Sequence, residues 1–411
     1  MRLFVPAIFV VAFGVALCGA LPLLPSWTSP SSYVTELADP SSSGPSLVLR
    51  LLSSSHGLFT PRMVQTSHSS EPYWTNEIGK HLLRLRGVNF FDVTTDMEQG
   101  PVITAAMKQQ EPVFPTKLSH AKKLDRVYDE VSEDGPRENL AKFTSFRNRY
   151  YKSETGRSSQ LWLLEKVKEI ASANKDITVK EFEHEWGQNS IILHVPGRKS
   201  SNVSSSSSDA GLTILGAHLD STHLLPFLPA PGADDDGSGT VTILEALRGL
   251  LASGWQPETD VEWHWYSAEE GGLLGSQEVV REYVKRGTPI KAMLQQDMVA
   301  FVKQGTQERV GIVSDFTNEP LSKFVKRLVD AYLSIPYVDT KLGYAASDHG
   351  SWNKAGFPSA FAIEATYEDC NLRRIHSGND VIDYPEFSFA HLMQFVRLSS
   401  AFVVELGGWA K

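Results

Sequence analysis

Three consecutive aspartates stand between a Pro-Gly and a Gly-Ser-Gly in the stretch PGADDDGSGT, residues 231–240. Adjacent carboxylates repel one another, so such a run is either a solvated turn or a place for a bound cation. Other acidic and imidazole side chains follow predicted strands elsewhere in the chain: His218 with Asp220, Glu269 with Glu270, Asp297, and His376. Each alone is commonplace, since an Asp in a glycine-flanked turn usually caps a helix. Together they suggest one metal site.

The donor types suit zinc, which binds imidazole nitrogen and carboxylate oxygen and keeps a position for water in catalytic sites. Two histidines and three carboxylates carry a charge of −3, so two Zn²⁺ ions and a bridging hydroxide make a neutral site. Asp220 follows His218 by two residues on a strand, where it can accept the second imidazole N–H. Glu269 and Glu270 point apart on an extended chain, so one can bind metal while the other acts as general base.

The elements that must position these residues alternate between strands and helices. Apolar runs predict strands at 189–197, 212–220, 260–266, 291–301, 309–315 and 358–365. Apolar residues at helical spacing predict helices at 137–150, 157–173, 240–253, 319–333 and 385–404. We therefore expect a three-layer α/β/α fold with a central mixed, mostly parallel β-sheet of about eight strands. Ligands of such sheets bind beyond the carboxyl ends of the strands, where these acids and histidines fall.

The N-terminal part predicts secretion. Residues 1–20 have one Arg, an apolar run and a small-residue end at Ala20, which indicates a signal peptide; the alternative, a membrane anchor, needs a longer run. Residues 21–110 are rich in Ser, Pro and Thr and are interpreted as a pro-segment that covers a catalytic domain at 111–411, with the basic residues 84–86 as one candidate cleavage site. We expect an extracellular glycoprotein made as a zymogen, with Asn202 in its one glycosylation sequon.

Composition excludes several classes of function. The net charge of −9 argues against nucleic acid as a partner. Only Cys18 and Cys370 occur, so a single thiol remains after signal removal and no intrachain disulfide forms. No His-Glu-x-x-His and no Gly-x-Ser-x-Gly occurs, which excludes the single-zinc helix design and the usual serine-hydrolase signal. A monomer, free of the membrane once the signal is removed, is the default expectation.

The motifs LGAHLDST, PGADDDGSGTVTILEA, SAEEGGLLGSQ, LQQDM, GYAASDHGSW and IHSGNDVID closely resemble those of the secreted di-zinc leucine aminopeptidases of fungi and bacteria. The resemblance covers about residues 115–405, and 143–163 is most similar to the fungal branch. It implies an enzyme that removes N-terminal residues, preferring Leu and other large apolar ones, from peptides with a free N-terminus. Two zinc ions per chain and a zinc-bridged hydroxide are implied as well.

Carried over position by position, the resemblance implies that Asp235 bridges both zincs. His218 and Asp297 would complete one site, and Glu270 and His376 the other. Glu269 would be the general base, Asp236 would follow Asp235 through a cis peptide, and Tyr344 would donate to the oxyanion. The remaining residues that it implies line the leucine pocket: Met298, Ile363, Tyr367, Cys370 and Ile375.

One departure and several alternatives stay open. The family often has a disulfide around the tyrosine, but this chain has Leu342 and Ala346 at those positions, which leaves the pocket's width and preference open. A glutaminyl-cyclase-like acyltransferase with one zinc and a catalytically silent binding ectodomain are the competing hypotheses. Three other histidines are interpreted as non-ligands: His223 at a rim, His264 facing a core or helix layer, and His349, which with Asp348 is structural or supports a ligand.

Overall fold

The computed structural model describes residues 59–66, 71–100, 113–198, 211–225 and 228–410. The chain divides into two units, Met1–His56 and Gly57–Lys411, and the described residues all belong to the second. The predicted signal peptide, Cys18 and the sequon at Asn202 lie outside them.

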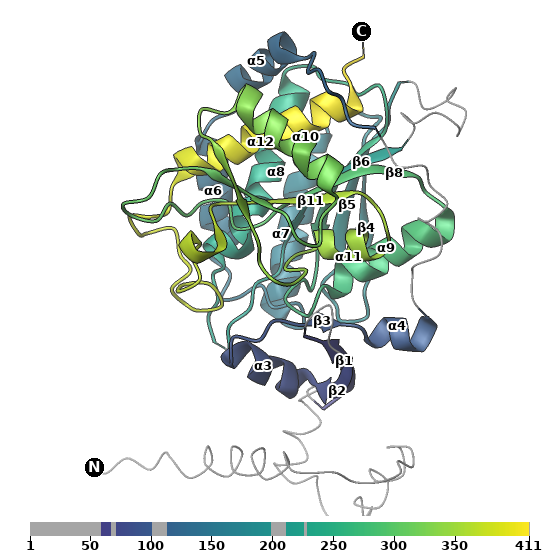
Figure 1. Ribbon diagram of the computed structural model, residues 1–411, viewed down its shortest axis with the longest axis vertical. Coiled ribbons are helices and arrows are strands. Elements are labelled where there is room, and N and C mark those ends of the chain that lie inside the picture. The colour runs from purple at the N-terminus through teal and green to yellow at the C-terminus, as the bar shows by residue number, and fades with distance from the viewer. Residues whose placement is uncertain (1–58, 67–70, 101–112, 199–210, 226–227, 411) are drawn as a thin grey trace, which may run out of the picture. The chain divides into compact units, whose positions relative to one another are not determined.

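An eight-stranded mixed sheet forms the centre of this unit (Figure 1). Its strands, in spatial order, are β10 (Tyr337–Thr340), β9 (Val310–Val313), β11 (Ser359–Ile363), β8 (Ile290–Gln296), β6 (Leu212–His218), β7 (Val261–Tyr266), β5 (Ser190–Val195) and β4 (Thr178–Phe182). The central strands β8, β6 and β7 run parallel to one another. Their carboxyl ends therefore meet at one edge of the sheet.

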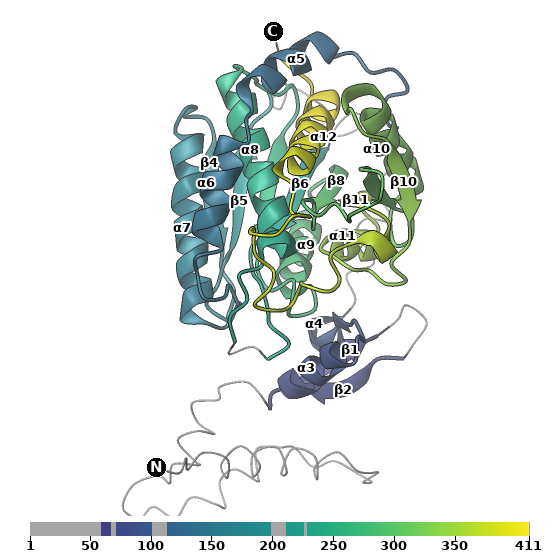
Figure 2. The same cartoon turned by 90° about the vertical axis from the view of Figure 1, so that its left-hand side faces the viewer.

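Helices cover both faces of the sheet, as Figure 2 shows. One face carries α7 (Glu154–Ala171), α8 (Gly239–Ala252), α10 (Glu319–Tyr332) and α12 (Phe389–Gly407), with α5 (Ala121–Glu130) and α6 (Asp134–Phe143) alongside. The other face carries α9 (Leu274–Arg286) and α11 (His349–Lys354). The predicted three-layer fold is confirmed.

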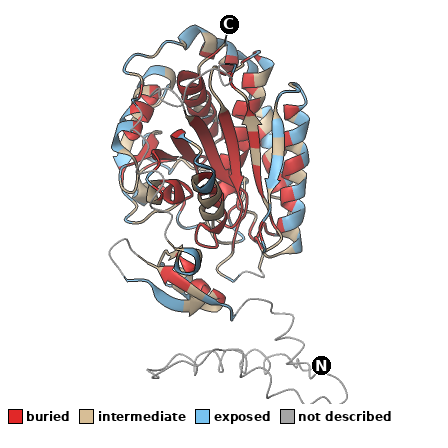
Figure 3. Cartoon of the chain, turned by 90° about the vertical axis from the view of Figure 1, so that its right-hand side faces the viewer, coloured by how far each residue is buried: buried red, intermediate tan, exposed pale blue. Residues whose placement is uncertain are grey.

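The pattern of β6 explains why the sheet is buried on both sides. Leu215 and Ala217 pack into the core beneath α8 and α12, whereas Leu212 and Ile214 pack beneath α9 and α11. A strand covered on both faces has a continuous apolar sequence, and the central strands are buried along their whole length (Figure 3). By length and composition α12 could span a bilayer, but 78% of its apolar window is buried, as in a core helix.

Several helix boundaries differ from the predictions. The helix expected over 137–150 runs from Asp134 to Phe143, and it is followed by a turn, a bend and the isolated β-bridge between Asn148 and Ala230. The helix expected from residue 157 begins at Glu154, because Ser153 accepts a hydrogen bond from the Gly156 N–H and so caps it. The last helix begins at Phe389 instead of 385, because the Ser388 hydroxyl accepts a hydrogen bond from the His391 N–H and so caps the helix.

A small separate sheet precedes this fold. It has the strand order β2 (Tyr73–Asn76), β1 (Pro61–Gln65), β3 (Phe91–Asp92), and α3 (Glu77–Leu85) and α4 (Thr94–Gln99) accompany it. Its interior holds an ionic cluster: the Lys80 ammonium, 1% exposed, lies 3.0 Å from Asp92 and 3.2 Å from Glu77. We call residues 59–100 the small subdomain; they lie within the predicted pro-segment.

Candidate active site and metal centre

The five predicted metal ligands lie at the carboxyl ends of the central strands. His218 is the last residue of β6, Asp297 directly follows β8, and Glu270 lies in the loop after β7. Asp235 lies in the turn Ala233–Ser238 that leads into α8. His376 comes from the loop before α12, nearly eighty residues further along the chain than Asp297.

The ligand atoms form two adjoining groups. His218, Asp236 and Asp297 make one group, and Asp235, Glu270 and His376 make the other, each with its atoms within 4.8 Å of one another. Asp235 lies between the two groups: its Oδ1 is 3.1 Å from His218 Nε2 and its Oδ2 is 3.1 Å from His376 Nε2. This is the geometry that a bridging carboxylate needs.

The donor atoms themselves fit divalent cations. Glu270 Oε1 and Asp297 Oδ1 are buried and have no hydrogen-bond partner among the described residues. A buried polar atom without a partner is costly, and two of them converge here. Imidazole and carboxylate donors together suit zinc and similar metals. The set therefore fits two cations better than it fits the protein alone.

The pKa values of the two histidines also indicate that this site favours positive charge. Burial alone would lower the pKa of His218, but the Asp297 and Glu269 carboxylates outweigh burial and raise it well above its ordinary value. Burial also opposes protonation of His376, yet Glu270 and Asp235 raise its pKa to about 10. The neighbouring carboxylates thus favour the protonated, positively charged form of both imidazoles. A bound metal ion would displace those protons.

Several neighbouring residues hold these ligands in place. The Asp220 carboxylate accepts the N–H groups of Glu269 at 3.0 Å and Glu270 at 3.3 Å. The prediction for the imidazole was only partly right: His218 Nδ1 lies 3.2 Å from the Asp220 carbonyl oxygen and 3.5 Å from its carboxylate. Ser347, which sequence reasoning missed, donates its hydroxyl to Asp297 at 2.6 Å.

The three adjacent aspartates have different surroundings. The Asp235–Asp236 peptide bond is cis, as the resemblance implied. Asp236 accepts the N–H groups of His218, Gly239 and Met298. Asp234 points away from the donor groups and accepts from the Ala300 N–H and the Asn371 amide. Two of the three acids therefore bind backbone or side-chain donors, and Asp235 is left at the centre.

Glu269 and Tyr344 line one cavity with the donor groups. Burial raises the pKa of Glu269 well above its ordinary value, and the neighbouring Glu270 carboxylate adds to this, while His218 opposes it. Burial likewise raises the pKa of the Tyr344 phenol, which therefore stays protonated and able to donate. A carboxyl group with a raised pKa next to a metal centre can exchange protons near neutral pH.

An adjoining cavity of about 360 Å³ contains most of the predicted pocket residues. Met298, Ile363, Tyr367 and Ile375 line it. Cys370 does not: it is buried behind the lining, and its thiol donates to the Thr366 carbonyl oxygen at 3.3 Å. The residues at the positions of the family's cysteine pair also line this cavity; they are Leu342 and Ala346.

The histidines interpreted as non-ligands lie outside both donor groups. His264 is buried and bonds to Tyr266 and Glu262. His349 is buried against the Phe361 ring, and burial lowers its pKa to about 3. His223 is half-buried near His376, and burial together with that neighbour lowers its pKa.

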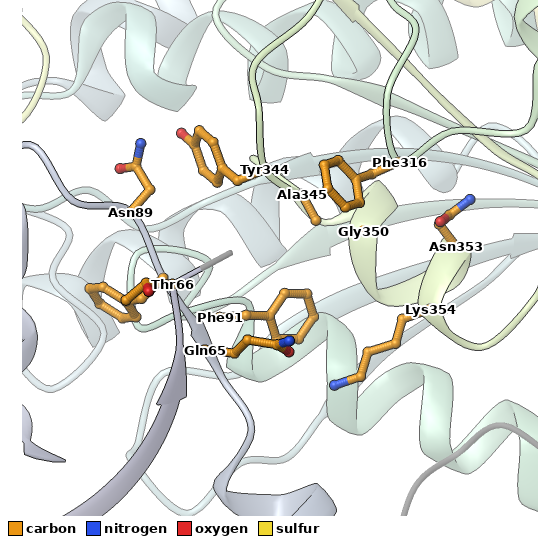
Figure 4. A pocket seen from close by; sticks show the side chains of 11 residues that line it. Gln65, Thr66, Asn89, Phe91, Phe316, Tyr344, Ala345, Gly350, Asn353 and Lys354 are labelled. Carbon is orange, nitrogen blue, oxygen red and sulfur yellow. The ribbon is translucent and has the colours of Figure 1, made fainter. Parts of the chain in front are cut away.

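Residues of the small subdomain line the same cavities. Arg84, Asn89 and Phe90 line the cavity that holds Glu269 and Glu270. In the neighbouring cavity, Figure 4 shows side chains of the small subdomain, Gln65 and Asn89 among them, facing the same space as Tyr344 and Phe316. The approach to the candidate centre is thus formed partly by residues 59–100.

This α/β fold with two adjoining groups of imidazole and carboxylate donors defines a metallohydrolase. The family model for peptidase family M28 matches residues 201–400. Leucine aminopeptidase 1 of Coccidioides posadasii is 46% identical over 347 residues, which cover 81% of this chain and 86% of that one. The chain belongs to peptidase family M28 and, with relatives of this name over most of its length, it is a metallo-aminopeptidase.

Solved structures agree with this assignment. The LapA aminopeptidase of Legionella pneumophila has a TM-score of 0.74 at 25% identity, over 86% of this chain and 100% of that one. A glutaminyl cyclase of Porphyromonas gingivalis has a TM-score of 0.52 at 17% identity, over 67% of this chain and 99% of that one. The second likeness extends to the fold alone. Because the leucine aminopeptidase relatives match most of the chain, the acyltransferase and silent-ectodomain hypotheses are not favoured.

Proposed function

We propose that this protein is a secreted, dinuclear zinc aminopeptidase that removes Leu and other large apolar residues from free peptide N-termini. The observation that carries the proposal is the position of Asp235, whose two oxygens lie 3.1 Å from His218 and His376. Two buried carboxylate oxygens without a hydrogen-bond partner among the described residues, Glu270 Oε1 and Asp297 Oδ1, belong to the same donor groups. His218, Asp235 and Asp297 would hold one zinc, and Asp235, Glu270 and His376 the other.

Bound zinc ions would supply Lewis acidity at this site. Glu269 lines the same cavity as Asp235, Glu270, Asp297 and His376, and it would take the proton from the attacking water and give it to the leaving amine. Tyr344, held in its protonated form, donates to the oxyanion that develops on the scissile carbonyl. The acidic cavity attracts the substrate's terminal ammonium group.

Apolar specificity is assigned to the adjoining cavity. Met298, Ile363 and Ile375 line it, and Phe361 contributes at its depth. Leu342 and Ala346 stand at the two positions where the family often has a disulfide. They pack against the apolar residues that line this cavity. Burying a Leu side chain there contributes about 2 kcal/mol relative to leaving it in water.

The decisive test is zinc content together with activity. The processed protein should bind two zincs per chain and cleave a Leu chromogenic amide, but not the same amide with a blocked amine. Fewer than two zincs without activity, or equal cleavage of the blocked substrate, would contradict the proposal. Glu269→Ala should retain both zincs and lose most turnover; if turnover survives, another residue is the base.

We further propose that the small subdomain keeps the enzyme latent until it is removed. The Asp92 N–H donates to the Gly272 carbonyl at 3.2 Å, two residues after Glu270. Asp96 forms ion pairs with Arg281 and Lys354, and Glu77 forms one with Lys152 at 3.0 Å. These contacts hold Arg84, Asn89 and Phe90 over the proposed substrate path.

Latency predicts that the unprocessed chain is slower than the processed one. Asp96→Ala removes both of its ion pairs and should raise the activity of the unprocessed chain. The matched control is Glu98→Ala, because Glu98 is exposed on the same helix. Faster turnover by the unprocessed protein would refute latency without touching the aminopeptidase proposal.

A further inference from the structure

Two buried side chains, the Arg149 guanidinium and the Asp380 carboxyl group, hold the turn that carries Asp235. The Arg149 side chain, 0% exposed, donates to the carbonyl oxygens of Pro231 and, at 2.9 Å, Gly232. The Asp380 carboxylate, 1% exposed, accepts the next amides of the same turn. Its Oδ1 lies 3.0 Å from the Asp234 nitrogen, and its Oδ2 lies 3.1 Å from the Asp235 nitrogen.

The match between each group and its partners is specific. A guanidinium has several donors in a rigid plane, which suits neighbouring carbonyls. A carboxyl group has two oxygens that can each accept one hydrogen bond, which suits two successive N–H groups. Gly232, at φ +55°, allows the close approach: an added Cβ would lie 2.8 Å from Arg149 Nη2 and 2.5 Å from the Asp235 carbonyl oxygen.

Arg149 and Asp380 also connect the Asp235 turn to segments that carry other predicted metal ligands. Asp380 lies four residues after His376, so its two hydrogen bonds join the His376 loop to the Asp235 turn. Arg149 Nε donates at 2.9 Å to the carbonyl oxygen of Leu219, the neighbour of His218. Burial lowers the pKa of Arg149 only to about 10, so it stays cationic at neutral pH beside this acidic centre.

We propose that Arg149 and Asp380 are positioning residues that fix Asp235 between His218 and His376, and thereby set the affinity for the two cations. Neither residue contacts the reacting atoms. Asp380 acts mainly on the group of Asp235, Glu270 and His376, because it joins two of the three loops that supply that group. Arg149 acts on both groups through the turn and Leu219. The inference rests on the two-cation site proposed above.

The variant Asp380→Asn tests whether Asp380 supports one of the two cation sites more than the other. Asparagine keeps one acceptor but places an N–H₂ donor against a backbone N–H. Metal-free full-length chain is titrated with Zn²⁺ in competition with a chromogenic chelator at 25 °C. We expect one of the two zinc dissociation constants to rise about 10–100-fold, the usual range for residues that support metal ligands, and the other to change much less. The absorption bands of the Co²⁺-loaded variant should shift, since they report ligand geometry.

Controls separate positioning from folding. Asp383→Asn changes an exposed acid three residues away and should leave both constants unchanged. Asp380→Glu, which keeps both acceptors, should bind the affected zinc more tightly than Asp380→Asn. Arg149→Lys keeps the charge but loses the planar set of donors, and should weaken both zincs. If Asp380→Asn fails to fold, Asp380→Glu and Arg149→Lys carry the same comparison.

Wild-type constants and an unshifted Co²⁺ spectrum in a folded variant would overturn the positioning role. Equal weakening of both zincs by Asp380→Asn would overturn the asymmetry. A wild-type chain that binds fewer than two zincs contradicts the proposed function instead. The two failures are therefore distinguishable in one set of titrations.

Discussion

A buried histidine in the small subdomain predicts that latency weakens in acid. His81 lies on α3, is 8% exposed, and packs with its ring centroid 6.2 Å from that of Tyr150 in the catalytic domain. Neither ring nitrogen has a hydrogen-bond partner among the described residues. Burial, with the nearby Arg84, Lys80 and Lys152 cations and against the Glu77 carboxylate, lowers its pKa from 6.5 to about 3.

The sign and size follow from linkage. While the small subdomain is docked, that is, packed against the rest of the protein, His81 is neutral. When the small subdomain is undocked, His81 takes a proton below its ordinary pKa of 6.5. Docking is therefore unaffected above that pH and weakens as the pH falls from 6.5 towards 3. At pH 5 the loss is at most about 2 kcal/mol, or about 30-fold in the docking equilibrium, because Arg84 and Lys80 belong to the small subdomain itself. The ion pair of Glu77 with Lys152, which joins the small subdomain to the rest of the protein, adds a loss of the same sign only at lower pH, because the pKa of Glu77 is lowered from 4.5 to about 2.

The assay compares unprocessed with processed enzyme at each pH, so that the pH profile of catalysis itself cancels. Between pH 7.5 and pH 5 the activity ratio of unprocessed to processed enzyme should rise for the wild type, by up to about 30-fold. His81→Phe keeps an aromatic ring against Tyr150 and cannot take a proton, so its ratio should stay nearly flat. A wild-type ratio that does not change, or a His81→Phe ratio that changes equally, would refute the reasoning.

Three further outcomes are expected of the site. Tyr344→Phe removes the proposed oxyanion donor and should lower kcat about 100-fold with a smaller change in KM; an unchanged kcat would exclude that role. Chelation should lower the melting temperature, and added Zn²⁺ should restore it, because the clustered carboxylates lose their compensating charge; calorimetry that shows no such difference would contradict a metal centre. Ile363→Phe narrows the apolar cavity and should shift kcat/KM from Leu towards Ala substrates; an unchanged ratio of the two would place the pocket elsewhere.

Much of the fold could be predicted because the central strands have simple sequences. β6 and β8 are largely apolar and β7 alternates apolar with polar residues, and a candidate ligand lies at or soon after the end of each: His218 closes β6, Asp297 follows β8, and Glu270 lies in the loop after β7. Parallel strands bring such positions to one edge. The strands at both edges, β4 and β10, and helix α9 were not predicted, because their apolar patterns are weak or short.

The helix expected over 137–150 ends early, at Phe143, and contacts of the residues that follow it lie far away in the chain. Arg149 leaves the helical path to reach the carbonyls of Pro231 and Gly232, more than eighty residues later. Local periodicity carries no information about such a contact. The same holds for Asp380, which follows His376 in an ordinary loop sequence and gave no signal until its two hydrogen bonds were seen.

The sequence by itself determined the fold class and the set of donor residues, since strand periodicity and residue chemistry are both local properties. The extent of the pro-segment, the signal peptide and secretion remain predictions from sequence. For Asp235, which the resemblance already singled out of three identical neighbours, only the tertiary structure gives the physical reason: it lies between the two histidines, and backbone N–H groups from distant loops occupy Asp236 and Asp234. It also decided that the small subdomain borders the same cavity, a contact between segments that no local pattern could specify.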